Sequence, residues 1–339
     1  MKSNSKPSSV QVTIHSSQFP EAVRRDLLDS LRTGQINHKF HYDSVKQTQL
    51  WLELHQAYSP SRTDPDCEAT YERGFRAAAQ RLRARRVHLI GLGCGGGQKD
   101  ARLLKLLIKA GKQVSYTPVD VSTAMVLTAQ HTVVSALPKV HCSPLVCDLA
   151  TADNLPVVLE ELSVGLRSAA RVFTFFGMLP NFVPEFILPR LAALVRPADH
   201  LVLSANLSPG PDYDAGMQRV LPQYDNALTR DWLLTFLVDV GIERTDGELR
   251  FRIEGARSGK PPKRFTADFH FRRRRRVKVD GERFSFKPGD RIRLFFSYRH
   301  TLATVRELAG GHGLRVLEEW GTRSGEEGVF LMRCAERRL

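Results

Sequence analysis

Apolar runs alternate with amphipathic stretches through the middle of the chain. The runs are short, which is typical of buried strands, and they cover Val87–Leu92, Val114–Val119, Val140–Cys147, Arg171–Phe176 and His200–Asn206. The stretches between them carry apolar residues three and four apart and predict helices at Lys99–Ala110, Ser122–Ser135, Ala152–Leu162 and Pro184–Leu194. This alternation favours right-handed crossovers and therefore a doubly wound parallel sheet.

The two ends of the chain show different patterns. Helical spacing predicts N-terminal helices at Ala22–Arg32, Ser44–Ala57 and Tyr71–Arg85. Beyond Ile242, polar and apolar residues alternate and predict antiparallel strands at Leu249–Glu254, Phe265–Val279 and Arg283–Phe296, with a hairpin turn at Asp280-Gly281. A helix at Thr304–Gly310 and strands at Leu314–Glu319 and Val329–Cys334 are expected to complete the first sheet.

We therefore expect an α/β fold with a second, α+β domain. The doubly wound domain is expected to span residues 81–241 and 301–339 and to bind a nucleotide cofactor. The second domain would combine N-terminal helices within residues 19–80 with an inserted antiparallel block at residues 242–300, and it would bind the substrate. Residues 1–18 are polar and lack the apolar core of a secretory signal, so they are expected to form a disordered tail.

Composition narrows the class of protein. Hydrophobic residues make up 42% and charged residues 25% of the chain, which is ordinary for a globular protein. No segment approaches the roughly 20 apolar residues that a membrane span needs. The five cysteines are scattered and odd in number, which indicates a reduced, cytoplasmic setting, and none has the paired spacing of a zinc site, so no metal is expected.

Positive charge is concentrated in two short segments. The formal net charge is +14, residues 81–86 contain four arginines, and Arg272–Arg276 is an unbroken run of five. Such a basic field attracts nucleic acid, anionic membrane surfaces or acidic metabolites, and charge alone does not choose among them. The run lies on a predicted strand, where a solvated, charge-protected edge is the favoured interpretation. A nucleic-acid interface is less favoured because aromatic and glycine residues are not interleaved with the arginines.

A glycine-dense turn follows the first predicted strand of the α/β pattern. Gly91, Gly93 and Gly96 satisfy the spacing of a dinucleotide fingerprint, although this match alone is weak evidence. The same turn also suits S-adenosylmethionine, whose ribose hydroxyls would bind Asp120 at the end of the next strand. That cofactor is favoured because the turn lies deep in the chain after a helical lead-in, and because Asp148 follows the third strand, where adenine would lie.

Eight short motifs resemble one enzyme family in their order and spacing. The motifs are KFHYD at Lys39–Asp43, AYSPSR at Ala57–Arg62, LGCGGGQKDARLL at Leu92–Leu104, YTPVDVS at Tyr116–Ser122, CDL at Cys147–Leu149, FFGMLPNF at Phe175–Phe182, QYDNA at Gln223–Ala227 and FFSYRH at Phe295–His300. Over about residues 38 to 335 the chain resembles the histidine N-alpha-methyltransferases, the S-adenosylmethionine enzymes of ergothioneine biosynthesis. The resemblance implies a class I methyltransferase fold with a Rossmann-like sheet.

The resemblance also implies a set of cofactor-binding residues. Gly93 and Gly95 would shape the turn under S-adenosyl-L-methionine, and Lys99 would lie near its carboxylate. Asp120 would hold the ribose hydroxyls, while Asp148 and Leu149 would bracket adenine. The expected set is completed by Cys94, Val121 and Gly177. We interpret Cys94 as a small residue that fits the turn, because nothing nearby in the sequence supplies a base to activate it.

Transfer of a methyl group to an amine needs the nitrogen lone pair held close to the methyl carbon, with water excluded. Asn181 follows the fourth strand, and in the resembled family the matching residue contacts the amino-acid substrate near its reacting amine. Tyr42 and Tyr58 match two substrate-pocket tyrosines, and Tyr42 and Asn181 are the candidate catalytic residues. An ordinary turn at Asn181 and buried core tyrosines are the alternative interpretations.

Three positions depart from the pattern of the family. Ser297 is retained, but Phe295 stands where the family offers an acidic residue to the imidazole of histidine. An unpaired buried donor costs roughly 1–3 kcal/mol, so histidine should bind poorly. Phe251 replaces a smaller apolar residue of the pocket, and Gly91 replaces an acidic residue, which leaves recognition of the cofactor's amino group open.

These observations favour an S-adenosylmethionine-dependent N-methyltransferase acting on a small amino-acid-like amine other than histidine. A methyltransferase of RNA or protein, docking through the basic hairpins, is the main alternative. A non-catalytic binding module is disfavoured by the presence of Asn181 and Asp120, and a nicotinamide oxidoreductase is disfavoured further. No membrane partner is expected, and the oligomeric state is open.

Overall fold

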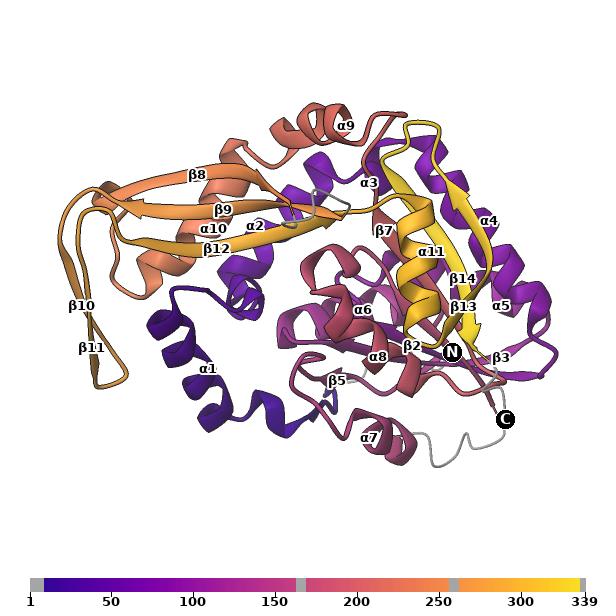
Figure 1. Cartoon of the computed structure of the whole chain (residues 1–339). Coiled ribbons are helices and arrows are strands. Elements are labelled where there is room, and N and C mark those ends of the chain that lie inside the picture. Colours follow the sequence, from indigo (N-terminus) through magenta and orange to yellow (C-terminus); the bar gives the residue numbers. More distant parts are fainter. Residues whose placement is uncertain (1–8, 163–168, 256–261, 336–339) are drawn as a thin grey trace.

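The main sheet has the doubly wound order that the sequence predicts. The computed structural model describes residues 9–162, 169–255 and 262–335 (Figure 1). Neighbouring strands follow the order β1 (Thr13–Ile14), β5 (Leu145–Val146), β3 (Gln113–Asp120), β2 (Arg86–Leu92), β6 (Ala170–Phe175), β7 (His200–Asn206), β14 (Glu327–Cys334) and β13 (Leu314–Gly321). The strands from β1 to β7 pair in parallel, and β14 runs antiparallel to both of its neighbours.

Helices cover both faces of this sheet because its strands are apolar on both sides. Along β2, Ile90 and Leu92 pack on one face against α7 (Leu155–Leu162), α8 (Pro184–Leu194) and α11 (Leu302–Gly311). Val87 and Leu89 pack on the other face, which is covered by α4 (Pro65–Arg81), α5 (Gln98–Lys109) and α6 (Thr123–Ala136). The strands of this sheet are therefore held in position by buried apolar contacts on both faces.

The second region is an antiparallel sheet with its own core. Its strands are β8 (Gly247–Glu254), β9 (Lys263–Phe271) and β12 (Arg291–Arg299), with β9 in the middle. A separate hairpin joins β10 (Arg275–Val279) to β11 (Glu282–Phe286), and Asp280 and Gly281 take positive φ at its turn, as predicted. Its core also includes residues of α1 (Pro20–Thr33), the 3₁₀ turn η2 (His38–His41), α2 (Val45–Tyr58) and α10 (Ala227–Asp239).

Two helices lie outside the domain boundaries expected from the sequence. Cys67, Tyr71 and Phe75 of α4 are buried in the core of the main sheet, so this helix does not belong with the other N-terminal helices. Conversely, Trp232 and Phe236 of α10 pack in the core of the antiparallel region. Sequence periodicity shows that a helix has an apolar face, but it does not show which sheet covers that face.

The expectation of a disordered tail through residue 18 is wrong from Thr13 onward. Strand β1 extends the edge of the main sheet, where the Thr13 and His15 amides donate to the carbonyls of Pro144 and Val146 over 3.0 and 2.9 Å. His15 also hydrogen-bonds the Asn154 side chain over 2.7 Å. Backbone pairing at a sheet edge needs no apolar side chains, so a polar segment can form it. Residues 1–8 lie outside the described part of the chain.

Two predicted strands are interrupted. Residues 140–147 divide into β4 (His141–Cys142) and β5 on either side of Pro144, which cannot donate to a ladder. Residues 265–279 divide into β9 and β10, because Arg272 and Arg273 form a bend between them. The amides of Arg272 and Arg273 donate to the carbonyl of Asp246 in this bend, over 2.9 and 3.3 Å.

The remaining short elements of the described chain lie in the connections between these helices and strands. They are η1 (Ser16–Gln18), α3 (Pro60–Thr63), η4 (Leu179–Asn181), α9 (Tyr213–Val220), η5 (Leu221–Gln223) and η6 (Arg244–Asp246). Among the described helices, none combines the length and the apolar character that crossing a bilayer requires.

Candidate functional site

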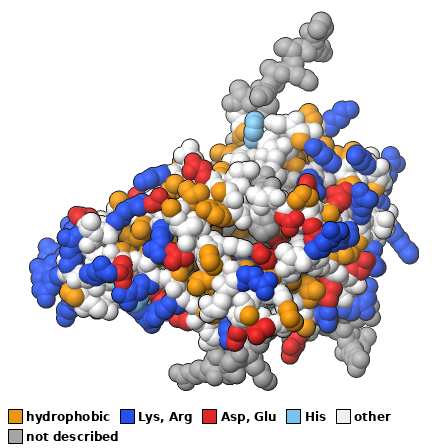
Figure 2. All heavy atoms as spheres, turned by 90° about the horizontal axis from the view of Figure 1, so that it is seen from above, with side chains coloured by type: hydrophobic (Ala, Val, Ile, Leu, Met, Phe, Trp, Pro, Cys, Tyr) orange, Lys and Arg blue, Asp and Glu red, His pale blue; other side chains and the backbone are white. Residues whose placement is uncertain are grey.

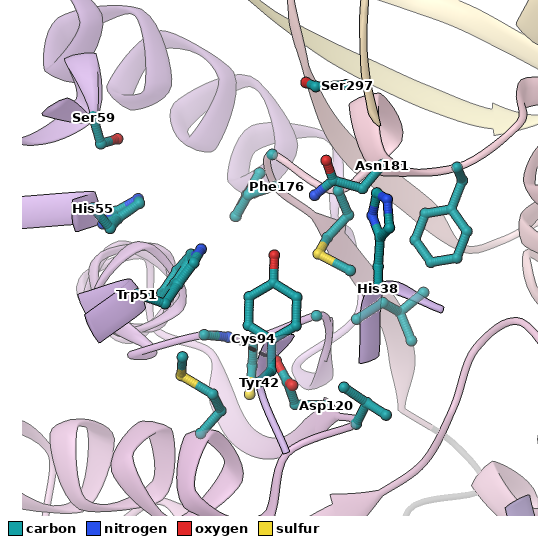
Figure 3. A pocket seen from close by; sticks show the side chains of 18 of the residues that line it. His38, Tyr42, Trp51, His55, Ser59, Cys94, Asp120, Phe176, Asn181 and Ser297 are labelled. Atoms are coloured by element: carbon teal, nitrogen blue, oxygen red, sulfur yellow. Dashed lines mark hydrogen bonds between the residues drawn. The ribbon is translucent and has the colours of Figure 1, made fainter. Parts of the chain in front are cut away.

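A cavity of about 1030 Å³ lies where the parallel strands of the main sheet end. Its floor is formed by the segments that follow β2, β3, β5 and β6, and its far wall comes from η2, α2, η4 and β12. Side chains from these separate elements point into one space, as Figure 3 shows for Tyr42, Asp120 and Asn181. The position agrees with the rule that open α/β sheets bind ligands at the carboxyl ends of their strands.

The glycine turn after β2 presents backbone to the cavity. The amides of Gly93 and Cys94 donate to the carbonyl of Val119 over 2.8 and 3.1 Å, which ties the turn to the end of β3. Gly93, Gly95 and Gly97 have φ values of 66°, 50° and 74°, a region that side chains disfavour. A Cβ on Gly97 would also lie 2.7 Å from the Cα of Ala129 in α6. The turn therefore requires glycine for its own shape and for close helix packing.

Asp120 lies at the cavity floor, at the end of β3. Its carboxylate accepts hydrogen bonds from the Gly95 amide over 3.2 Å and from the Ser122 amide over 3.1 Å. Burial raises the pKa of Asp120 to about 6, although these backbone donors oppose the rise. Burial, and secondarily the charge of Asp120, also raises the pKa of the Tyr42 hydroxyl. The hydroxyl of Tyr42 is therefore kept as a neutral group that donates or accepts.

The expected adenine-binding residues lie along the same edge, after β5. Asp148 is buried, and its carboxylate accepts from the Ala150 amide over 2.8 Å and lies 3.4 Å from the ammonium of Lys39. Leu149 and Val121 line the cavity beside it. Lys39 belongs to η2, so this ion pair connects the cofactor side of the cavity to the N-terminal segment.

Lys99 and Gly177 line the opposite end of the floor. The Lys99 ammonium donates to the Tyr71 hydroxyl over 3.0 Å and lies 4.3 Å above the centre of the Tyr71 ring. Gly177 has a φ of 68° and donates its amide to Ser204 over 2.9 Å. A Cβ on Gly177 would meet no described atom within 4 Å, so this backbone is open.

This half of the cavity fits S-adenosylmethionine. The ribose hydroxyls can donate to the Asp120 carboxylate, the bare turn at Gly93 to Gly97 leaves room for the nucleoside and its tail, and Asp148 with Leu149 lies where the base would extend. All nine expected cofactor residues line one cavity. Their individual roles remain predictions.

The acceptor half of the cavity is lined mainly by aromatic rings and amides. Asn181 is the last residue of η4. Its backbone N–H donates to the Met178 carbonyl over 2.9 Å and closes this turn. Figure 3 shows the Asn181 side chain and the Tyr42 hydroxyl facing the same space from opposite sides. Ser297 of β12 hydrogen-bonds the Tyr224 hydroxyl over 3.1 Å. Tyr58 also lines the cavity, but its side chain is exposed, so it lies at the rim.

Phe295 is covered by a histidine of the chain itself. The His38 ring stacks on Phe295 with centroids 5.2 Å apart and an interplanar angle of 14°. Its Nε2 atom accepts from the Phe296 amide over 3.2 Å, which places the ring proton of neutral His38 on Nδ1. Burial, His41 and Arg264 lower the pKa of His38 to about 3. The uncharged His38 imidazole is therefore fixed against Phe295, the residue that stands where the family has an acid for the imidazole of its substrate.

Sequence reasoning placed one residue wrongly in the pocket and missed several others. Phe251 does not line the cavity: it lies on β8, half-buried, with the Arg230 guanidinium 5.3 Å from its ring centre. Phe251 lies outside the eight quoted motifs, so none of them fixed its position in the alignment. The lining residues that sequence reasoning missed include His38, Trp51, Asp100, Tyr224 and Trp232. His38 lies beside a quoted motif and Asp100 and Tyr224 lie inside quoted motifs, which was the available signal. Trp51 is placed in the cavity by the fold of α2.

Comparison with known proteins gives a family and several similar folds. The model of the S-adenosylmethionine-dependent, histidine-specific methyltransferases matches residues 23–334. The chain is similar to the CcbJ methyltransferase of Streptomyces caelestis at 14% identity and a TM-score of 0.38, covering 78% of this chain and 90% of that one. It is similar to CalS10, an amino pentose methyltransferase of Micromonospora echinaspora, at 13% identity and a TM-score of 0.35, covering 83% and 97%. No curated protein sequence matches.

Proposed function

Because the chain belongs to the histidine-specific, S-adenosylmethionine-dependent methyltransferase family, we propose that it methylates the amine of a small amino-acid-like substrate other than histidine. The family establishes a methyltransferase and its cofactor, whereas the acceptor is our inference. The observation that carries this inference is the pairing of Asn181 and Tyr42 around a space that His38 and Phe295 close on one side.

The bound cofactor supplies a methyl group on a positively charged sulfur, which an amine lone pair takes as the carbon–sulfur bond breaks toward sulfur. The chain's residues need to hold that lone pair in line and exclude water. The Asn181 amide oxygen can accept a hydrogen bond from the amine N–H, which fixes the direction of the lone pair. The Tyr42 hydroxyl, kept neutral by burial, can orient the amine or its neighbouring polar group from the other side. The proton that the methylated amine loses passes to water.

The acceptor wall argues against histidine as the substrate. A substrate imidazole N–H needs an acceptor, and the side chain at the expected position is the apolar ring of Phe295. In addition, the stacked His38 ring occupies one face of Phe295. A hydrogen-bonding group left unpaired in this wall would cost roughly 1–3 kcal/mol, so the pocket selects a side chain with an apolar or aromatic surface.

The basic hairpin gives less support to a nucleic-acid or protein substrate. Figure 2 shows Lys and Arg side chains gathered at the end of the molecule that carries β10 and β11. However, Arg273 and Arg275 each lie 3.0 Å from the buried Asp246, and Arg272 pairs with Glu248. These arginines therefore balance acids of their own chain, and the hairpin is not required to bind a polyanion.

The proposal is tested by offering the enzyme a panel of free amino acids and related amines with isotopically labelled S-adenosylmethionine. Mass spectrometry of the products should show a labelled methyl on an amine whose side chain is apolar or aromatic, with histidine among the poorest acceptors. Histidine as the best acceptor, or label found only on RNA or protein in parallel reactions, would overturn it.

A further inference from the structure

Asp100 is a buried carboxylate that reaches the cavity from the first turn of α5. Its side chain lines the cavity, although the residue as a whole is only 2% exposed. The Tyr116 hydroxyl donates to Oδ2 over 2.6 Å, and the Thr174 hydroxyl donates to Oδ1 over 2.7 Å. Both donors are neutral, and they come from β3 and β6, the strands on either side of β2. They therefore fix the carboxylate without neutralising its charge.

The absence of a side chain at Gly91 is what makes room for this carboxylate. A Cβ built on Gly91 would overlap Asp100 Oδ2 and would lie 3.2 Å from both Asp100 Cγ and the Tyr116 hydroxyl. Gly91 has no positive φ that would require glycine for backbone reasons. The Asp100 carboxylate therefore stands directly over the end of β2, in the space that a side chain at position 91 would take.

The other carboxylates of the cavity are held by different partners. Asp120 accepts two backbone amides, Asp148 pairs with Lys39, and Glu327 accepts from the Tyr71 hydroxyl. At the rim, Glu68 lies 2.9 Å from Arg102. Asp100 differs because its two hydroxyl partners leave further lone pairs of the carboxylate available.

S-adenosylmethionine carries one group that would pair with a buried carboxylate, the ammonium of its methionine tail. We propose that Asp100 binds this ammonium and supplies from α5 the acid that position 91 lacks. The carboxylate lies beside the glycine turn, and Lys99, the preceding residue, is the expected neighbour of the tail's carboxylate. The two charges of the tail would then meet two consecutive side chains at the start of one helix. The proposal rests on the cofactor of the family and not on the identity of the acceptor.

Electrostatics agree with this geometry. Burial raises the pKa of Asp100 to about 6, with Tyr116, Thr174 and Lys99 opposing the rise. A buried carboxylate is costly without a cation, and an ammonium hydrogen-bonded to it offsets that cost. Cofactor binding should therefore favour the ionised form of Asp100.

The test is calorimetric binding of two ligands to Asp100→Asn, which keeps the shape of the side chain and removes its charge. S-adenosylhomocysteine should bind at least tenfold more weakly than to the wild type, while its deaminated analogue, which lacks only the ammonium, should bind both proteins within about twofold. Equal weakening of both ligands would indicate a purely structural role and overturn the proposal, as would unchanged affinity for S-adenosylhomocysteine. No acceptor is present, so failure here would not bear on the proposed amine.

A second variant keeps the proposal testable if Asp100→Asn does not fold. In the double variant Gly91→Glu/Asp100→Thr the acid stands on β2. The threonine at position 100 is smaller than aspartate and leaves room for the new glutamate side chain. This double variant should prefer S-adenosylhomocysteine over the deaminated analogue as the wild type does, whereas Asp100→Thr alone should lose that preference. A preference retained by Asp100→Thr would contradict the assignment. Thermal unfolding followed by circular dichroism checks that each variant is folded.

Discussion

The two halves of the cavity are built in different ways. The cofactor half comes from neighbouring strand ends of one sheet, where backbone amides and buried carboxylates at Gly95, Asp120 and Asp148 form the proposed binding surface. The acceptor half is assembled from three separate parts of the chain: η2 and α2, then η4, then α10 and β12. It is lined by rings such as Phe295 and Trp232. The shape of the cofactor half is therefore fixed by the main chain, whereas single side-chain substitutions can change the chemistry of the acceptor half.

This difference predicts where substitutions act. Changes in the cofactor half should affect binding of S-adenosylhomocysteine whichever acceptor is present. Changes in the acceptor half should alter turnover and selectivity while leaving cofactor binding intact. The following experiments test that separation, from the largest expected effect to the smallest.

Asp120→Ala should weaken S-adenosylhomocysteine binding by at least about 100-fold, because charge-assisted hydrogen bonds to the ribose are lost. The measurement is isothermal titration calorimetry. Asp153→Ala is the matched control, since Asp153 lies on the surface in an ion pair with Arg190. Similar affinities for the two variants would remove Asp120 from the cofactor site.

Asn181→Ala should reduce kcat/KM by about 100-fold, because the reacting lone pair is no longer held in line. Its affinity for S-adenosylhomocysteine should stay within about twofold of the wild type, since the side chain lies in the acceptor half. Steady-state kinetics with the best acceptor of the panel, together with calorimetry, separates the two quantities. Unchanged turnover would show that Asn181 has no part in the reaction.

Cofactor affinity should depend on pH through the two buried carboxylates of its half. The pKa of Asp120 and that of Asp100 are both raised to about 6 by burial. If both carboxylates bind the cofactor as we propose, the bound state will favour both ionised forms. Affinity should therefore be full above that pKa and fall as the pH drops through it, by up to about tenfold per carboxylate one pH unit below. Calorimetry across this range should show a shallower fall for Asp100→Asn, and a flat wild-type profile would contradict the assignment.

Histidine acceptance should rise by about tenfold in the double variant Phe295→Glu/His38→Ala, which restores a carboxylate and removes the ring stacked against it. Phe295→Glu alone should gain less, because the new carboxylate would face His38. Phe251→Glu, outside the cavity, serves as the control for introducing charge. If histidine turnover is the same in all three variants, the interpretation of this wall is incorrect.

The smallest effect is expected at the basic hairpin. Arg274 and Arg276 are exposed, and replacing both with Gln should change stability by no more than about 0.5 kcal/mol and leave methyl transfer to the amine unchanged. Urea unfolding and steady-state kinetics measure these quantities. A large loss of turnover would revive a docking role for this hairpin.

The contrast between the halves also explains what the sequence could predict. The glycine turn, Asp120 and Asp148 each lie at or just after the end of a strand, so their grouping at one sheet edge followed from strand order alone. The contact of His38 with Phe295 joins residues more than 250 positions apart, and only the packing of η2 against β12 creates it. Asp100 was missed because its importance depends on the missing side chain of Gly91, which sequence motifs treat as a separate position.

Assignment of helices to domains failed for a related reason. Periodicity correctly predicted that α4 has an apolar face. The helix α10 was not predicted, although it also has an apolar face. In both cases the partner of that face is a sheet formed by distant strands. Local pattern therefore predicts that an element exists, while long-range packing decides which core it joins.

The central claim is most directly tested by a crystal structure of the enzyme with S-adenosylhomocysteine and the preferred amine from the panel. We predict that the ribose hydroxyls contact Asp120, that the amine nitrogen lies between the thioether sulfur and the Asn181 amide, and that the amine's side chain packs against Phe295. An amine bound away from Asn181, or a nucleoside bound outside the glycine turn, would contradict the account.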